Sequence, residues 1–219
     1  AKAYQQALAD GSEVIAIHLS SGLSGTVQNA RLAKEMVDGE SRLAILDSLT
    51  ASMGQGLLAV RAAELAGTGL PLKEIVTEVE IMRWKICSIF MVDTLKFLLK
   101  GGRINRVQAT VGSLLDIKPV LHINPEGKID QLDKVRGRRA ALRRLISMVE
   151  EQGIGLAGQT VGISHAICLP DAEKMGDTFK ERFGAKEVII GEIGAVIGTH
   201  VGHGTLAIFF QGESRADMT

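Results

Sequence analysis

Residues 14–26 read Val-Ile-Ala-Ile-His-Leu-Ser-Ser-Gly-Leu-Ser-Gly-Thr, and this stretch decides the kind of fold that the chain adopts. The apolar run Val14–Ile17 predicts a buried parallel strand, and a helix is expected to begin near Val27. Three serines and two glycines therefore fall at a strand-to-helix turn, where hydroxyls and backbone N–H groups gather at the positive end of a helix. A turn of this kind receives an anion: a carboxylate, a phosphate or a tetrahedral oxyanion.

The elements around this turn predict a parallel, doubly wound α/β/α domain. Apolar periodicity indicates strands at 14–19 and 43–46. It indicates helices at 4–9, at 27–39, after the second polar turn as far as about residue 66, and at 72–85. A second polar turn, 48–56, follows the second strand, so both polar turns fall at the carboxyl ends of strands, where ligands bind in such sheets. Two strands do not form a stable sheet alone, and the chain opens without Met. We therefore expect further N-terminal strands that this sequence lacks.

The pattern changes after residue 86, and residues 87–219 predict a second α/β domain with a mixed sheet. Two strand-like runs, 117–123 and 128–135, indicate a hairpin around a Pro/Gly turn. The other expected elements are strands at 88–92, 160–164, 187–191 and 205–210, and helices at 95–99, 107–115, 138–151 and 172–182. The expected domains are thus residues 1–86 and residues 87–219.

The composition argues against several classes of protein. Lys plus Arg and Asp plus Glu are 25 each and aromatic residues make up 4%, so no nucleic-acid partner is expected. No apolar run reaches the ~18 residues of a membrane span. Cys87 and Cys168 lie in separate apolar runs and are expected to be buried, reduced thiols, which is typical of a cytoplasmic protein.

The serine turn could either cap a helix or bind a ligand. It carries four hydroxyl groups, those of Ser20, Ser21, Ser24 and Thr26. One capping residue would suffice, so ligand binding is favoured. The turn differs from the Gly-x-Ser-x-Gly pattern of a serine hydrolase, because Thr26 takes the place of the last glycine. A hydrolase that uses Ser24, His200 and Asp47 stays open as the alternative function.

Residues 194–205 are rich in glycine and predict a loop just before the last strand, in which the backbone can approach a ligand closely. His200 in this loop can donate a hydrogen bond to a carboxylate or act as a base. His203 follows three residues later, but neither Cys nor a carboxylate lies nearby in the sequence to complete a metal site. No metal is therefore expected.

A basic cluster spans the middle of the chain: Arg103, Arg106, Lys134, Arg136, Arg138, Arg139, Arg143 and Arg144. Such a run is usually a solvated helix face. Two of its arginines, however, fall at the start of a predicted helix, which the helix dipole disfavours. This placement indicates an external use, with phosphate or an acidic partner surface fitting better than nucleic acid. A nucleic-acid-binding regulator is the third hypothesis.

Together these motifs resemble the DegV family of fatty-acid-binding proteins over essentially the whole chain. The motifs that carry the resemblance are Ser20–Thr26, Asp47-Ser48, Gly54–Gly56, Leu98–Ile104, Gly112–Pro119 and Ile197–Gly202. Several motifs in this order are more specific than any one of them. The resemblance implies a two-domain α/β protein that encloses one long-chain fatty acid between its domains, with the carboxylate at the interface.

The resemblance also implies which residues hold the carboxylate. Ser24 matches the family serine that hydrogen-bonds it, and His200 matches the family histidine near the head group. Gly25, Thr26 and Thr199, which flank these two residues in the same motifs, are expected to take part in the same site. The family begins with a further segment whose threonine also contacts the carboxylate, and that segment is absent from this sequence. His203 stands where the family usually has proline.

The partner implied by the resemblance is a dihydroxyacetone-kinase-like fatty acid kinase. In bacteria that kinase phosphorylates the bound fatty acid to an acyl phosphate for phospholipid synthesis. Arg103 and Arg136 match arginines that engage the kinase. On this resemblance the chain is a carrier with no catalytic residue and no cofactor, and it is not itself the kinase.

Overall fold

The computed structural model describes residues 1–104 and 116–215, so the helix expected at 107–115 lies outside the described residues. The N-terminal part contains α1 (Lys2–Leu8), β1 (Val14–His18), α2 (Thr26–Lys34), η1 (Glu40–Arg42), β2 (Leu43–Asp47), α3 (Met53–Gly67) and α4 (Leu72–Lys85). The rest contains β3 (Ile86–Met91), α5 (Lys96–Gly101), β4 (Ile117–Ile123), β5 (Ile129–Arg136), α6 (Arg138–Gln152), η2 (Leu156–Gly158), β6 (Thr160–His165), α7 (Leu169–Phe183), β7 (Glu187–Glu192), α8 (Ala195–Val201) and β8 (Leu206–Gln211).

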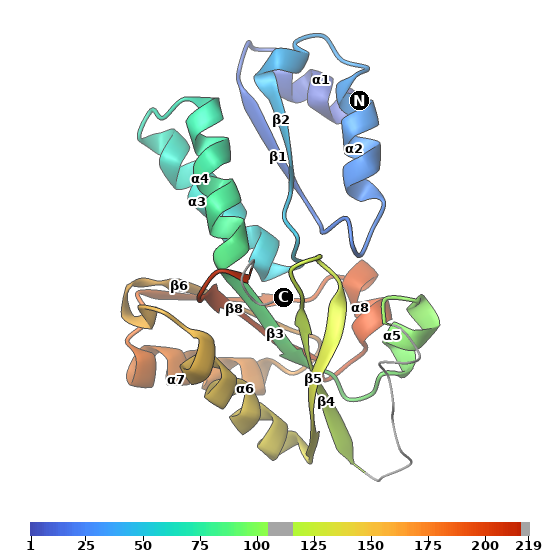
Figure 1. Cartoon of the computed structure of the whole chain (residues 1–219), viewed down its shortest axis with the longest axis vertical. Helices are drawn as coiled ribbons and strands as arrows, with labels where there is room; N and C mark the ends of the chain where they lie inside the picture. The colour runs from blue at the N-terminus through green and yellow to red at the C-terminus, as the bar shows by residue number, and fades with distance from the viewer. Residues whose placement is uncertain (105–115, 216–219) are drawn as a thin grey trace.

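The described strands form two sheets, which lie one above the other in Figure 1. β1 and β2 pair in parallel, from Val14 opposite Leu43 to His18 opposite Asp47. The larger sheet has the order β5-β4-β3-β8-β6-β7, in which β6 and β7 pair in parallel and the other neighbours are antiparallel. The predicted combination of a parallel and a mixed α/β sheet is confirmed. The domain boundary at residue 86 stays a prediction, although β3 enters the larger sheet there.

Helices pack against both faces of the small β1–β2 sheet. Val14 and Ala16 face a small apolar cluster around Leu43 that α1 helps to form. Ile15 and Ile17 face the opposite way, toward the main cluster that contains residues of α3 and α4. Successive side chains of a strand point to opposite faces, so a five-residue strand serves both layers. The small sheet is therefore doubly wound, as the sequence predicts.

The larger sheet is buried on both faces at its centre. Ile89 and Ile208 pack in the cluster shared with α6 and α7, which Figure 1 shows on the far side from the β1–β2 unit. Phe90 and Phe209 alternate with them and face α3, α5 and α8. The side of the sheet that carries these two phenylalanines is the side that bears the candidate site.

The sequence predicts a loop for the glycine-rich stretch before the last strand. The structure instead forms the helix α8 there. Gly194 and Gly202 lie just outside the helix, and Gly202 ends it with a φ of 79°. Gly198 lies within it, and its N–H donates to the Gly194 carbonyl at 2.9 Å. The expectation was wrong because two of the four glycines cap the helix and only Gly198 lies within it.

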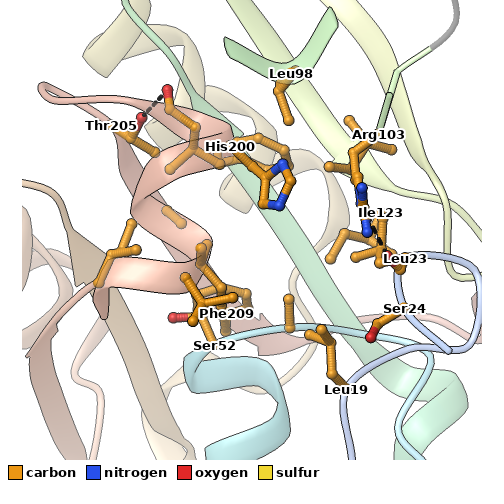
Figure 2. Close-up of a pocket in the computed structure, with 18 residues that line it drawn as sticks. Leu19, Leu23, Ser24, Ser52, Leu98, Arg103, Ile123, His200, Thr205 and Phe209 are labelled. Atoms are coloured by element: carbon orange, nitrogen blue, oxygen red, sulfur yellow. Dashed lines mark hydrogen bonds between the residues drawn. The ribbon is translucent and has the colours of Figure 1, made fainter. Parts of the chain in front are cut away.

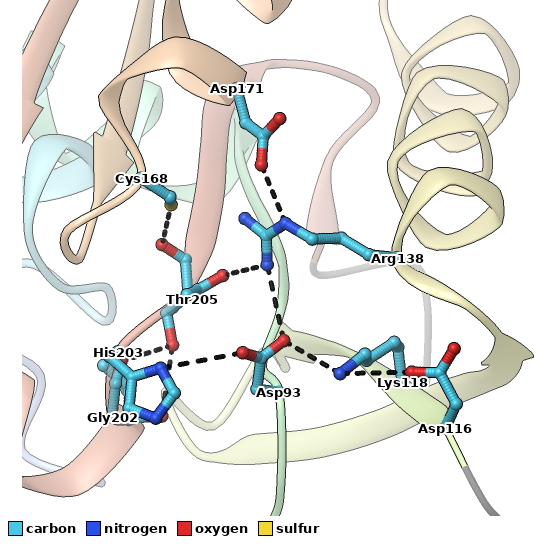
Figure 3. A network of polar contacts seen from close by, with 11 residues as sticks. Asp93, Asp116, Lys118, Arg138, Cys168, Asp171, Gly202, His203 and Thr205 are labelled. Atoms are coloured by element: carbon cyan, nitrogen blue, oxygen red, sulfur yellow. Dashed lines mark hydrogen bonds and ion pairs between the residues drawn. The ribbon is translucent and has the colours of Figure 1, made fainter.

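Two arginines of the basic cluster are used inside the protein, contrary to the external use that was inferred for them. Arg138 donates to Asp171 at 2.7 Å and to the Gly204 carbonyl at 2.6 Å, and its Nη1 lies 3.4 Å from Asp93 (Figure 3). Arg144 donates to Asp133 at 2.9 Å and to Glu151 at 2.7 Å. For Arg138, acidic partners from other segments outweigh the unfavourable position at the start of α6, whereas Glu151 lies on the same helix as Arg144. Arg106 lies outside the described residues.

Both cysteines are free thiols. Cys87 is buried as expected, and burial raises the pKa of its thiol to about 11. Cys168 is only half-buried, contrary to expectation. It precedes α7 directly after β6, and its thiol donates to the Thr205 carbonyl at 3.3 Å.

One buried arginine joins the two sheets, and the sequence pattern gave no sign of it. The side chain of Arg215 is 3% exposed and donates to the carbonyls of Leu49, Arg83, Ile123 and Asn124 at 3.0–3.3 Å. These carbonyls belong to the turn after β2, to α4, and to β4 with the hairpin turn that follows it. Burial lowers the pKa of the Arg215 guanidinium. The four carbonyl oxygens take the place of the solvation that the cation loses.

Replacing this guanidinium should destabilise the whole fold. We expect Arg215→Met to lower the free energy of unfolding by about 3 kcal/mol, because several buried charge-assisted hydrogen bonds are lost together. Arg143→Met is the matched control, since Arg143 is exposed on α6 and its loss should change stability by less than about 0.5 kcal/mol. Urea unfolding followed by far-ultraviolet circular dichroism measures both. Equal stability of the two variants would contradict the role of Arg215.

Candidate ligand-binding pocket

A pocket lies between the β1–β2 unit and the face of the larger sheet that carries Phe90 and Phe209 (Figure 2). Its lining residues are Leu19, Leu23, Ser24, Ala51, Ser52, Phe90, Leu98, Arg103, Ile123, Ile129, Ile193, Val196, Ile197, His200, Val201, Thr205, Ala207 and Phe209. The cavity volume is about 120 Å³. Most of the lining side chains are apolar, with a few polar groups among them, which is the usual character of a small-molecule site.

Two of the polar residues in the wall are already satisfied by the protein. The Thr205 hydroxyl donates to the carbonyls of Val201 and Gly202, at 3.1 and 2.9 Å. The Ser52 hydroxyl lies 2.9 Å from that of Ser164. Ser52 also has a φ of 52°, which is rare for a residue other than glycine, at the turn into α3. These hydroxyls hold the wall in place.

The first serine of the turn is a structural residue. Ser20 is fully buried, and its hydroxyl donates to the Gly127 carbonyl at 2.7 Å. The same oxygen accepts the N–H of Gly22 at 3.1 Å. Gly127 has a φ of +74°, and a Cβ there would come within 2.1 Å of the Ser20 hydroxyl. Ser20 therefore fastens the serine turn to the β4–β5 hairpin, and only a glycine fits opposite it.

Ser24 is half-buried and borders the pocket, as predicted for a ligand-binding residue. Its hydroxyl lies 2.7 Å from that of Thr26 and accepts the backbone N–H of Thr26 at 3.3 Å. Thr26 is the first residue of α2, and Gly25 precedes it. Gly25 and Thr26 are exposed and lie next to the pocket without lining it, so their part in the site stays a prediction.

His200 and Arg103 also border this cavity, and Arg103 lies on the side of the serine turn. Figure 2 shows the His200 ring extending from α8 into the pocket, with the Arg103 guanidinium across from it. Nδ1 of His200 is buried and has no hydrogen-bond partner among the residues that the structure describes. Arg103 donates from Nε to the Leu23 carbonyl at 3.1 Å and from Nη1 to the Gly101 carbonyl at 2.6 Å. The structure thus brings together Ser24 and His200, which lie 176 residues apart in the sequence.

Two further residues that the sequence singled out lie on the surface. Thr199 is exposed, and its hydroxyl donates to the Val196 carbonyl at 2.8 Å. Arg136 is exposed at the end of β5, opposite Ile117. Arg103 is exposed and also borders the pocket, and its expected contact with the kinase stays a prediction. No local sequence pattern predicts that Arg103 borders the pocket, because Arg103 reaches it only through the packing of α5 against α8.

The arrangement does not favour the hydrolase alternative. No hydrogen bond joins Ser24 to His200 within residues 1–104 and 116–215. One carboxylate oxygen of Asp47 accepts the N–H groups of Ser21 and Leu49, each at 3.1 Å, so this side chain shapes two turns. The described part of the chain contains no cluster of three or more His, Cys, Asp or Glu side chains that could hold a metal.

None of the helices in the described residues is long and apolar enough to cross a membrane. An apolar pocket with a few polar groups in its wall has the usual form of a small-molecule site. The model of the DegV family, described as uncharacterised proteins, matches residues 1–213. A DegV domain-containing protein of Clostridium perfringens is 36% identical over 217 residues, which cover 98% of this chain and 75% of that protein. The chain belongs to the DegV family.

Solved structures give the same result for the fold. The structure of DegV from Bacillus subtilis, described as a fatty acid binding protein, is 35% identical with a TM-score of 0.83, over 97% of this chain and 75% of that one. The Streptococcus pneumoniae fatty acid kinase (Fak) B3 protein, loaded with linoleic acid, has a TM-score of 0.84 at 21% identity, over 97% of this chain and 76% of that one. The second likeness concerns the fold alone. A DegV family protein from Thermus thermophilus, 31% identical with a TM-score of 0.88 over 96% of this chain and 75% of that one, is likewise described as binding fatty acid.

The two serines at the start of the turn offer a test of its attachment. We expect Ser20→Ala to lower the free energy of unfolding by about 1–2 kcal/mol, because the buried Gly127 carbonyl loses its donor. Ser21→Ala is the control, since the Ser21 side chain is exposed and the contact of this residue with Asp47 runs through its backbone N–H. Thermal and urea unfolding measure the difference. A Ser21→Ala variant as unstable as Ser20→Ala would contradict the assignment.

Proposed function

We propose that the chain binds a long-chain fatty acid in this pocket, with the carboxylate at the end formed by Ser24, Arg103 and His200. The observation that carries the proposal is the distribution of polar groups around an otherwise apolar cavity. Thr205 and Ser52 are bonded within the protein, whereas Ser24, Arg103 and the His200 ring border the cavity with polar groups. One end of the cavity can therefore receive an anionic head group, and the rest receives an alkyl chain.

The energetics suit such a ligand. Each methylene group that leaves water contributes roughly 0.8 kcal/mol. The apolar side chains that line most of the cavity would shield such a chain from water. Hydrogen bonds from Ser24, Arg103 and His200 would offset the desolvation of the carboxylate.

The direct test is to extract the purified protein with organic solvent and to identify the extract by mass spectrometry. We expect a long-chain fatty acid in the extract, or stoichiometric uptake of added oleate by the delipidated protein. Absence of both would contradict the proposed function.

Removal of one head-group contact should weaken binding without unfolding the protein. We expect Ser24→Ala to weaken oleate binding by roughly 1–3 kcal/mol, because the carboxylate loses a donor in a site that excludes water. Ser21→Ala again serves as the control and should keep the affinity. Titration calorimetry with oleate measures both variants. An unchanged affinity of Ser24→Ala would remove Ser24 from the site, and labelling of Ser24 by a fluorophosphonate probe would favour the hydrolase alternative.

The bound fatty acid is then presented to a partner kinase, and the chain itself is a carrier without a catalytic residue. The carboxylate end lies beside the surface that carries Arg103, and Arg136 is exposed on the edge strand β5. The fold likeness to the Fak B3 protein supports this role. The kinase would form an acyl phosphate for phospholipid synthesis in the cytoplasm, as the sequence resemblance implies.

A variant of Arg136 can test kinase recognition without affecting fatty-acid binding. We expect Arg136→Glu to reduce acyl-phosphate formation by a fatty acid kinase at least about tenfold, since reversing a charge in a complementary interface adds repulsion. The same variant should bind oleate with unchanged affinity, because Arg136 does not line the pocket. Arg143→Glu is the control for a charge reversal elsewhere on the surface. Equal kinase activity for wild type and Arg136→Glu would contradict the contact.

A further inference from the structure

The His200 ring fits into the pocket because residue 101 has no side chain. A Cβ on Gly101 would lie 2.1 Å from Nδ1 of His200 and 2.9 Å from its Cε1. Gly101 is the last residue of α5, and α5 packs against α8, which carries His200. The φ of Gly101 is not in the left-handed region, so the backbone itself would accept alanine. The requirement for glycine at this position is therefore steric and concerns the imidazole.

This contact decides which ring nitrogen can serve a ligand. A neutral imidazole carries one N–H and one bare nitrogen. Nδ1 is buried against Gly101 and meets no acceptor in the described part of the chain, so an N–H placed there would be a buried donor without a partner. With the proton on Nε2, the bare Nδ1 instead faces the Cα of Gly101, where a C–H group can lie against its lone pair. His200 then presents an N–H donor to the pocket that it borders.

The carbonyl of the same glycine holds a second part of the pocket. It accepts Nη1 of Arg103 at 2.6 Å, and Nε of Arg103 donates to the Leu23 carbonyl at 3.1 Å. Leu23 precedes Ser24 in the serine turn. Gly101 therefore touches His200 through its Cα side and is linked to the turn of Ser24 through Arg103.

We propose that Gly101 is the positioning residue of the head-group end: it seats His200 as the Nε2–H tautomer and, through Arg103, holds the Ser24 turn against it. This inference rests on the proposed function for the nature of the ligand. The tautomer of His200, however, is a property of the protein without ligand. An experiment can therefore contradict the proposed function without contradicting the seating of His200, and the reverse.

The first experiment reads the tautomer in the ligand-free wild-type protein. Imidazole ¹⁵N shifts of His200, assigned by comparison with His200→Gln, distinguish a protonated Nε2 from a protonated Nδ1. We expect the Nε2–H form at neutral pH. A protonated Nδ1 would overturn the proposal whether or not the protein binds a fatty acid.

The second experiment is a double-mutant cycle on oleate affinity with Gly101→Ala and His200→Ala. The alanine methyl displaces the imidazole, so we expect Gly101→Ala to weaken oleate binding about tenfold or more, as for a lost hydrogen bond to a charged group. The double variant should bind no more weakly than His200→Ala alone, because the ring is then already gone. Gly198→Ala in α8 is the matched control, since a Cβ there meets nothing within 4 Å, and it should keep wild-type affinity.

The outcomes are distinct. Additive losses in the cycle, or wild-type affinity of Gly101→Ala, would overturn the role of Gly101. If no variant and no wild-type protein binds oleate, the proposed function fails, and the tautomer measurement alone decides the seating of His200. Should Gly101→Ala fold poorly, the wild-type spectrum still decides.

Discussion

The structure depends on a buried cation that holds two sheets together. The β1–β2 sheet has only two strands among the described residues, and a sheet of that size needs packing against other elements. Arg215 supplies a fixed link, because its guanidinium contacts carbonyls of the turn after β2, of α4 and of the β4–β5 hairpin. No carboxylate is among these contacts, so the charge is stabilised by carbonyl dipoles whose positions are set by the fold. The pocket lies between the elements that Arg215 joins.

The larger sheet divides two tasks between its faces. Residues such as Ile89 and Ile208 complete the cluster under α6 and α7. The alternating residues Phe90 and Phe209 line the pocket on the opposite face. Because side chains alternate along a strand, one stretch of sequence supplies both a packed core and an apolar wall. The face under α6 and α7 can be packed fully, while the other leaves space that a ligand can fill.

Polar groups near the pocket fall into two sets by what they already bond. Ser20 and Thr205 are buried and donate to backbone carbonyls, so they fix the turns around the cavity. Ser24 and His200 border the cavity and keep hydrogen-bonding capacity beyond their contacts within the protein. Arg103 has features of both sets, since it donates to two backbone carbonyls and also lines the pocket. The head-group end is therefore assembled from segments whose own positions are fixed by buried hydrogen bonds.

The sequence by itself determined the order of the elements, the parallel character of the first sheet and the hairpin of the second. These follow from local apolar periodicity and turn residues, which act over a few positions. It also indicated Ser24 and His200 through motifs, but it treated residues 194–205 as a loop and Arg138 as an external charge. Only the tertiary structure decided that Arg138 pairs with Asp171 and that the Ser20 hydroxyl bonds a backbone carbonyl and not a ligand. The same holds for the part of Arg103 and Gly101 in the shape of the pocket. Each of these depends on which distant backbone or side chain lies within hydrogen-bonding or van der Waals distance, and periodicity along one chain carries no such information.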